Sequence, residues 1–243
     1  MKQNDPNFDA SYIALKQTKL FRGVAREVLQ MILGDCEYTE WQKGENIDSD
    51  LTDQYLFILL DGKVKITQID PRSGRSVALF LLQTGDIYDF LPLLDGKEHL
   101  SFPVPLEPCK LLRVPLETAR DWIRNYAEFN QAILPYLGDK MREMESFSIS
   151  LVFHDTTTRL ANLILKHTKE CKDDKTHHYS VKLINNLSHE SLAELIGSVR
   201  AVVSIQLKKL KEEETIVSKR GQLAVKNLEK LLHRCDIEKH SNI

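Results

Sequence analysis

The side chains best suited to chemistry in this sequence lie on one face of a short predicted helix near the C-terminal end. These residues are Arg200, Ala201, Ser204, Ile205 and Lys208. Arginine can donate two hydrogen bonds to guanine, serine can bond several base edges, and alanine or isoleucine can pack on the thymine methyl group. The pattern therefore predicts recognition of base pairs in the major groove of DNA.

Two helices joined by a tight turn must position this face. In LSHESLAELIGSVRAVVSIQLKKL, Ser188 is expected to cap the first helix, Gly197 to form the turn and Ser198 to cap the second helix. A helix-turn-helix of this kind can place its second helix in the major groove. An ordinary helical hairpin in a protein core is the alternative. The residues that the second helix is expected to bury, wholly or in part, are Val199, Val202, Val203 and Leu207.

A basic β-hairpin is predicted directly after the two helices. Its strands are Thr215–Ser218 and Gln222–Val225, with Lys219 and Arg220 in the turn. The tip of such a wing can lie against the DNA backbone, whereas a solvated hairpin is the alternative. The complete set predicted to contact DNA is Ser188, Ser198, Val199, Arg200, Ala201, Ser204, Ile205, Lys208, Lys219 and Arg220.

Charge is distributed unevenly along the 243 residues, although the net charge is only -2. Residues 156–243 carry 16 Lys and Arg against 11 Asp and Glu, whereas residues 1–155 carry 17 against 24. A basic segment that holds a helix-turn-helix suits phosphate contact, and an acidic companion does not. Chance scatter of surface charge is the alternative.

The four cysteines are far apart and form no CxxC pair, so neither an iron-sulfur cluster nor a zinc ribbon is expected. Reduced thiols in a cytoplasmic protein are the default. The sequence also contains no apolar run of membrane-spanning length and no visible signal peptide, which predicts a protein without a membrane partner.

Short strands separated by turn residues follow a helical segment at 20–36 in the first half of the chain. The clearest strands are Tyr55–Leu60, Val64–Ile69, Ser76–Leu82 and Lys110–Val114. The Asp61-Gly62 pair is a strong hairpin signal. Regular spacing of this kind predicts an antiparallel barrel or roll.

A long helix is predicted from Glu128 to Phe153, with Pro135 in or near its first turn or bending it. Its apolar residues recur at alternating steps of three and four, which suits a two-stranded coiled coil and hence a homodimer. Packing on its own barrel is the alternative, and both can hold. The predicted seam is Leu134, Leu137, Met141, Met144, Ser148 and Leu151.

The fold class is therefore α+β. Residues 1–127 are predicted to form an N-terminal antiparallel β-roll that senses a signal, 128–153 the dimerisation helix, and 154–243 a winged helix-turn-helix domain. We expect no enzyme, because His99 is the only histidine before His154 and a metal-dependent barrel enzyme needs a cluster of ligands.

This order of parts resembles the CRP/FNR family of bacterial transcription regulators, over about residues 20–232. The motifs that carry the resemblance are KGE at 43–45, LLDGKVKI, TGD at 84–86, FHD at 153–155 and LAELIGSVRAVVSIQLKKL. The resemblance implies a cytoplasmic homodimer that binds a palindromic operator in double-stranded DNA and contacts RNA polymerase. It also implies an effector or cofactor site between the roll and the long helix.

The effector region departs from cyclic-AMP-binding members. Phe90 falls near their ribose-binding glutamate, and His99 and Leu100 fall at their phosphate-binding Arg-Ser pair. A cyclic phosphate needs a fixed positive charge, so cAMP binding is not expected. The residues predicted to line the effector pocket are Tyr88, Asp89, Phe90, His99, Met144 and Glu145.

The hinge LVFHDTTTRLANLIL resembles that of haem-containing carbon-monoxide sensors, and His99 could be an axial haem ligand. Asp89 and Leu91, however, stand where those proteins carry Cys and His ligands. A small apolar effector, a protein partner or no effector are further alternatives, and redox sensing by Cys36 and Cys109 is a weaker one.

The recognition helix departs as well, because Ala201 and Ile205 stand where many members carry a Glu and an Arg. This predicts an operator unlike the common half-sites and richer in A·T pairs. It also leaves open a rival function, a ligand-binding regulatory module that acts through protein contacts without sequence-specific DNA binding.

Overall fold

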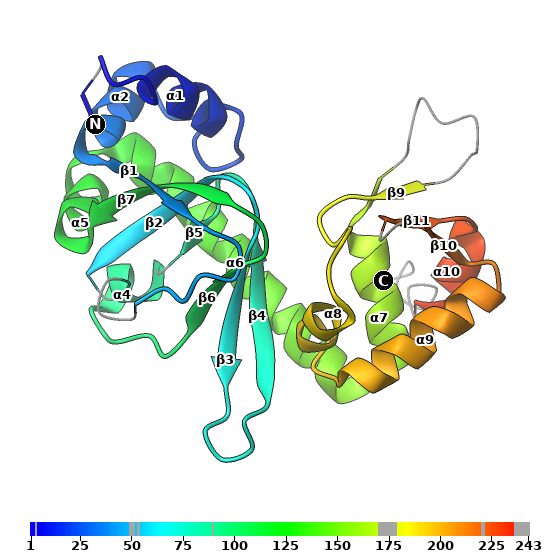
Figure 1. Ribbon diagram of the computed structural model, residues 1–243. Helices are drawn as coiled ribbons and strands as arrows, with labels where there is room; N and C mark the ends of the chain where they lie inside the picture. The colour runs from blue at the N-terminus through cyan, green and yellow to red at the C-terminus, as the bar shows by residue number, and fades with distance from the viewer. Residues whose placement is uncertain are drawn as a thin grey trace, which may run out of the picture. The chain divides into compact units, whose positions relative to one another are not determined.

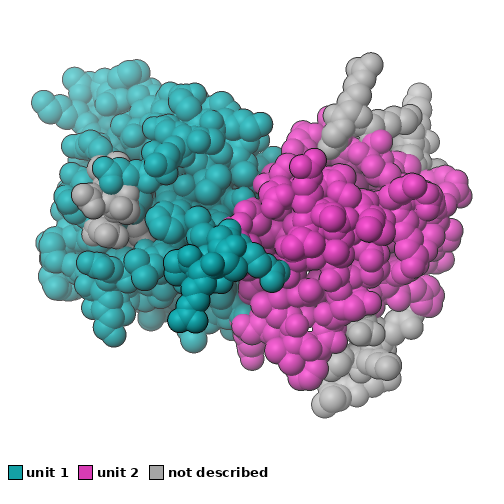
Figure 2. Space-filling model, turned by 60° about the horizontal axis from the view of Figure 1, so that its bottom comes forward, with its two compact units in different colours: residues 1–75, 79–144 teal, residues 76–78, 145–243 magenta. Residues whose placement is uncertain are grey.

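The computed structural model describes residues 1–2, 4–48, 52, 54–88, 90–169, 179–219 and 222–235. The chain forms two compact units, one of residues 1–75 with 79–144 and one of residues 76–78 with 145–243 (Figures 1 and 2). Both combine antiparallel strands with helices, so the predicted α+β class is confirmed. Among the described residues, no helix is long and apolar enough to cross a membrane.

The N-terminal unit is built around two antiparallel sheets that form the predicted roll (Figure 1). One has the strand order β1-β7-β2-β5 and the other β4-β3-β6. A side chain cannot be accommodated at Gly62, where φ is +99° and a Cβ would lie 2.7 Å from the Cys109 sulfur. The strands are β1 (Glu37–Trp41), β2 (Tyr55–Asp61), β3 (Val64–Ile69), β4 (Ser76–Leu82), β5 (Ile87–Tyr88), β6 (Phe102–Pro105) and β7 (Cys109–Pro115).

Helices cover this roll and share a core with it. The predicted helical segment at 20–36 is too long: α2 begins only at Arg26, and the residues before it form turns. Leu20, Phe21 and Val24 are nevertheless buried, so their apolar spacing reflects the core and not a helix. The helices are α1 (Phe8–Lys16), α2 (Arg26–Asp35), α4 (Phe90–Asp95), α5 (Leu116–Asn125) and α6 (Ala127–Phe153).

Helix α6 is the longest element, and the division between the two units falls within it. It begins at Ala127, so Pro135 lies in the helix interior and not in its first turn. A proline there supplies no N–H for the bond to the carbonyl of residue 131. The buried face of α6 consists of Phe129, Ile133, Tyr136 and Lys140.

Within its described residues, the C-terminal unit packs helices against an antiparallel sheet of strand order β10-β11-β9-β8. Asp155 caps α7, its carboxylate accepting a hydrogen bond of 2.8 Å from the N–H of Thr158. Strands β8 and β9 were not predicted, since they are only two and three residues long. The elements are α7 (Thr156–Lys166), β8 (Thr168–Lys169), β9 (Tyr179–Val181), α8 (His189–Leu195), α9 (Arg200–Glu212), β10 (Ile216–Lys219), β11 (Gln222–Val225) and α10 (Leu228–Arg234).

Candidate functional site

The helix-turn-helix is formed by α8 and α9. As predicted, Ser188 caps α8, its hydroxyl oxygen accepting a hydrogen bond from the N–H of Ser191 at 3.1 Å. The turn needs a glycine, because Gly197 has φ +60° and a Cβ there would approach a methyl group of Leu151 to 2.7 Å. The buried apolar side chains that hold the pair together include Leu192, Ala193, Ile196, Val203 and Leu207.

The predicted cap of the second helix is wrong. Helix α9 has Val199 as its N-cap residue, with an extended backbone, and no side chain bonds the first turn. Ser198 stands one residue too early; its N–H instead donates to the carbonyl of Ala193 at 2.8 Å and closes the turn. Val199 is also 46% exposed, not buried, because the cap residue turns away from the core.

The outward face of α9 carries the predicted base-reading residues. Arg200, Ala201, Ile205 and Lys208 are exposed and Ser204 is half-exposed. Ile205, in the middle of the helix, is 64% exposed. The face therefore offers a guanidinium group, a hydroxyl group and two apolar side chains side by side.

Positive charge accompanies these groups along α9. Lys208, Lys209 and Lys211 lie in its second half, and Lys208 is 3.7 Å from the carboxylate of Glu212. Both groups of this pair are well exposed, so the pair is weak and Lys208 can exchange its partner. In the described part of the chain, Arg200 makes no ion pair, which leaves its donors for another partner.

The predicted wing is present as the antiparallel pair β10 and β11, in which Lys219 lies opposite Gln222. Arg220 and the side chain of Lys219 lie outside the described residues. Their predicted contact with the DNA backbone stays a prediction.

The predicted dimer seam divides between two environments. Leu137 and Met144 are half-buried and pack against the two core clusters of the N-terminal unit. Leu134, Met141, Ser148 and Leu151 are exposed. One face of α6 thus packs on the roll, while Leu134 and Met141 carry exposed apolar side chains. That the seam meets a second copy of the chain stays a prediction.

Most residues predicted to line an effector pocket gather in one region of the roll. Tyr88 is buried and donates a hydrogen bond to the carbonyl of Ser101 at 3.0 Å. Phe90 and Met144 pack against the buried cluster that contains Tyr88 and Phe80. His99 is half-buried, with Nδ1 3.2 Å from the hydroxyl of Ser101. Glu145, in contrast, is exposed, and Asp89 lies outside the described residues.

Sequence reasoning missed the charged group at the centre of this region. Lys140 on α6 is buried and pairs with Asp86 at 2.9 Å and with Glu143 at 3.6 Å. Its ammonium also lies 5.5 Å from the ring centre of Phe80 and 5.4 Å from that of Tyr136. A lysine in line with apolar helix positions was the available signal, but its partner is far away in the sequence.

Aromatic rings surround this ion pair. Phe90 makes edge-to-face contacts with Phe80 and Tyr136, at centroid distances of 6.1 and 6.5 Å. The hydroxyl of Tyr136 accepts a hydrogen bond of 2.9 Å from the N–H of Ile87. Burial, with a further contribution from the nearby Asp86 carboxylate, raises the pKa of Tyr136 well above its usual value. Aromatic side chains therefore surround the Lys140 ammonium, whose charge is balanced by carboxylates of the same unit.

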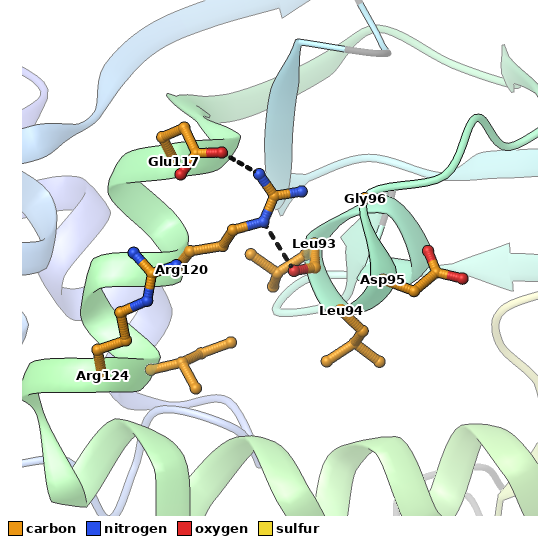
Figure 3. A pocket seen from close by; sticks show the side chains of 8 residues that line it. Leu93, Leu94, Asp95, Gly96, Glu117, Arg120 and Arg124 are labelled. Carbon is orange, nitrogen blue, oxygen red and sulfur yellow. Dashed lines mark hydrogen bonds and ion pairs between the residues drawn. The ribbon is translucent and has the colours of Figure 1, made fainter.

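A cleft of about 520 Å³ lies between α4 and α5, with Arg120 at its centre (Figure 3). The guanidinium group donates to the carbonyl of Leu93 at 3.2 Å and to that of Pro92 at 2.7 Å, and it pairs with Glu117. These bonds satisfy the last carbonyls of α4 and fix that helix to α5. Arg120 is thus committed to the fold, and the cleft does not offer a ready anion site.

Metal and thiol chemistry find little support in the described residues. They contain no group of three or more His, Cys, Asp or Glu side chains that could hold a metal ion. Burial raises the pKa of Cys109 and of Cys235 to about 11, and that of Cys36 further. Such thiols react slowly, which weakens the redox role considered for Cys36 and Cys109. Cys171 lies outside the described residues.

Two family profiles match the chain. The Crp-like helix-turn-helix domain matches residues 158–234, and the cyclic nucleotide-binding domain matches residues 40–126. The first match contains α8 and α9, and the second contains most strands of the roll.

Known proteins with this arrangement are similar over most of their length. The Global nitrogen regulator of a Nostoc species is 26% identical over 176 residues, which are 70% of this chain and 76% of that protein. The Cyclic AMP receptor protein of Thermus thermophilus is 26% identical over 204 residues, 83% of this chain and 89% of that protein. A solved structure of a CooA mutant from Carboxydothermus hydrogenoformans shares the fold, with a TM-score of 0.71, 20% identity and coverage of 90% of this chain and 96% of that one.

Proposed function

Because this chain belongs to the CRP/FNR family of bacterial transcription regulators, we propose that it binds double-stranded DNA as a homodimer, with α9 in the major groove. The observation that carries this proposal is the outward face of α9, where Arg200, Ser204, Ile205 and Lys208 are accessible together. A twofold-symmetric dimer would bind a palindromic operator whose half-sites lie about 34–36 Å apart. It would act in the cytoplasm, with RNA polymerase as a further partner and without catalysis of its own.

Base reading in this proposal falls chiefly to Arg200. Its guanidinium group suits guanine, and Ala201 and Ile205 suit thymine methyl groups. The wing residues Lys219 and Arg220 would contact phosphates. The operator should therefore differ from the TGTGA and TTGAT half-sites and be richer in A·T pairs.

Selection of binding sites from random duplex DNA, followed by a salt series, tests this function. Arg200→Ala should relax base preference, while Lys219→Ala should weaken binding to all sequences and reduce the salt slope by about 1. Arg124→Ala, an exposed arginine on α5, is the matched control and should change neither property. Selection of TGTGA or TTGAT would contradict the base-reading scheme. Binding without a steep salt dependence would contradict the proposed phosphate contacts, and failure to bind any duplex would contradict DNA binding altogether.

We further infer that the roll senses a signal other than cAMP. The buried cation Lys140 pairs with Asp86 and lies against the rings of Phe80 and Tyr136. A cyclic phosphate would have to break this buried pair, which is costly. Saturating cAMP should therefore leave both the melting temperature and operator affinity unchanged, and an increase in either would contradict the inference.

Two alternatives have specific support. A haem-based gas or redox sensor is favoured by His99, a half-buried imidazole in the predicted pocket region, beside Ser101. A Soret band in protein expressed with haem supplied would establish it. A module that acts through protein contacts is favoured by the exposed apolar side chain of Ile205. The salt series separates this second alternative from DNA binding.

A further inference from the structure

A hydrogen bond between side chains joins the two helices of the helix-turn-helix. Nδ1 of His189, the first residue of α8, lies 2.8 Å from the hydroxyl oxygen of Ser204 on α9. Both side chains are half-buried. The bond therefore ends on the same face that carries Arg200 and Lys208.

This contact changes what Ser204 can recognise. A free serine hydroxyl rotates and can either donate or accept a hydrogen bond, so it distinguishes bases poorly. In the neutral tautomer that carries its proton on Nε2, Nδ1 of the imidazole accepts a hydrogen bond from the Ser204 hydroxyl, and only the oxygen lone pairs then remain for an outside partner. In the major groove the donors that match an acceptor are the amino groups of adenine and cytosine.

We propose that His189 is a specificity-positioning residue, which fixes the Ser204 hydroxyl so that its oxygen accepts a hydrogen bond from the amino group of adenine or cytosine at one position of each half-site. This inference rests on the proposed function, because it requires α9 to lie in the major groove. His189 itself contacts no base; it acts through Ser204.

Duplexes that differ only at the base pair facing Ser204 test this pair of residues with the full-length protein. The wild-type protein should prefer adenine or cytosine over guanine or thymine by about three- to tenfold, the effect of one hydrogen bond. Ser204→Ala and His189→Ala should each abolish this preference, and the double variant should behave like either single variant. Binding to random DNA should stay unchanged in all of them.

Two amide variants separate positioning from a structural role. Asparagine places its side-chain oxygen near the position of Nδ1, whereas glutamine reaches the position of the other ring nitrogen. His189→Asn should therefore keep the preference and His189→Gln should lose it. Glu190→Ala, at the exposed neighbouring position, is the control and should keep it.

The outcomes distinguish this inference from the proposed function. Only the role of His189 is overturned if Arg200→Ala relaxes base preference but His189→Ala leaves base preference unchanged. The same holds if His189→Ala lowers the affinity for all sequences equally. A wild-type preference for guanine or thymine at the Ser204 position also overturns it. If the wild-type protein shows no sequence preference at all, both proposals fail.

Discussion

At Lys140 a positive charge lies where α6 would otherwise bury a hydrocarbon side chain. Its ammonium is enclosed by the carboxylates of Asp86 and Glu143 and by the rings of Phe80 and Tyr136. Removing one partner of a buried pair leaves the other charge without compensation, and this costs more than an exposed pair ever contributes. The ion pair therefore holds α6 against the turn before β5.

Lys140→Met should lower the free energy of unfolding by about 3–5 kcal/mol, because Asp86 would remain buried without its counter-ion. Urea denaturation followed by circular dichroism measures the change. Lys19→Met is the matched control: Lys19 also pairs with a carboxylate of α6, that of Asp139, but in an exposed position. Its loss should cost less than about 1 kcal/mol. Equal effects of the two substitutions would show that burial adds nothing to the Lys140 pair.

The cap of α7 acts at the scale of one element. The N–H of Thr158 donates to the Asp155 carboxylate and holds the pKa of that group below its usual value. Because the folded pKa is lowered, the charge stabilises the fold above the ordinary aspartate pKa. This contribution is lost as the pH falls through the lower folded pKa.

Asp155→Ala should lower the free energy of unfolding by about 1 kcal/mol at neutral pH, through the loss of the cap. Asp155→Asn keeps a capping oxygen without the charge, so it isolates the pH-dependent part. Denaturation midpoints of the wild-type protein and Asp155→Asn should differ at neutral pH and converge in acid. A difference that stays constant down to acid pH would exclude the charge as its cause.

Elements with local signals were predictable, whereas those fixed by distant contacts were not. Ser188 and Gly197 predict the start of α8 and the turn after it. Short strand-like segments separated by the Asp61-Gly62 turn predict β2 and β3. Strands β8 and β9 have no such pattern because they are too short. In the segment before α2, the apolar pattern predicted a helix that is absent. Its apolar residues are buried in the core although the backbone there forms turns.

The same distinction holds for the candidate sites. The outward face of α9 follows from helix periodicity alone. The link from His189 to Ser204 and the pair of Lys140 with Asp86 depend on how separate elements meet, which the sequence does not display. The predicted cap of α9 was wrong by one residue, because the backbone N–H of Ser198 closes the turn and Val199 occupies the N-cap position.

At the scale of the whole molecule, α6 leaves apolar side chains exposed in one copy of the chain. Met141 is 73% exposed and Leu134 61% exposed, and Val152 and Phe153 follow at the end of the helix. Large apolar side chains gathered along one exposed helix are costly in water and mark an interface. A second copy of α6 is the partner that the proposed homodimer requires.

Met141→Glu should weaken dimerisation by at least about tenfold, because two carboxylates would be buried face to face in the seam. Sedimentation velocity over a concentration series measures this, and Met31→Glu, at an exposed methionine on α2, should leave the dimer intact. The monomer still carries the cations of α9, so it should bind random DNA with its electrostatic affinity largely kept. Its preference for the palindrome should fall most, because one half-site is then read at a time. A Met141→Glu protein that remains dimeric, or keeps the full palindrome preference, would move the dimer interface away from α6.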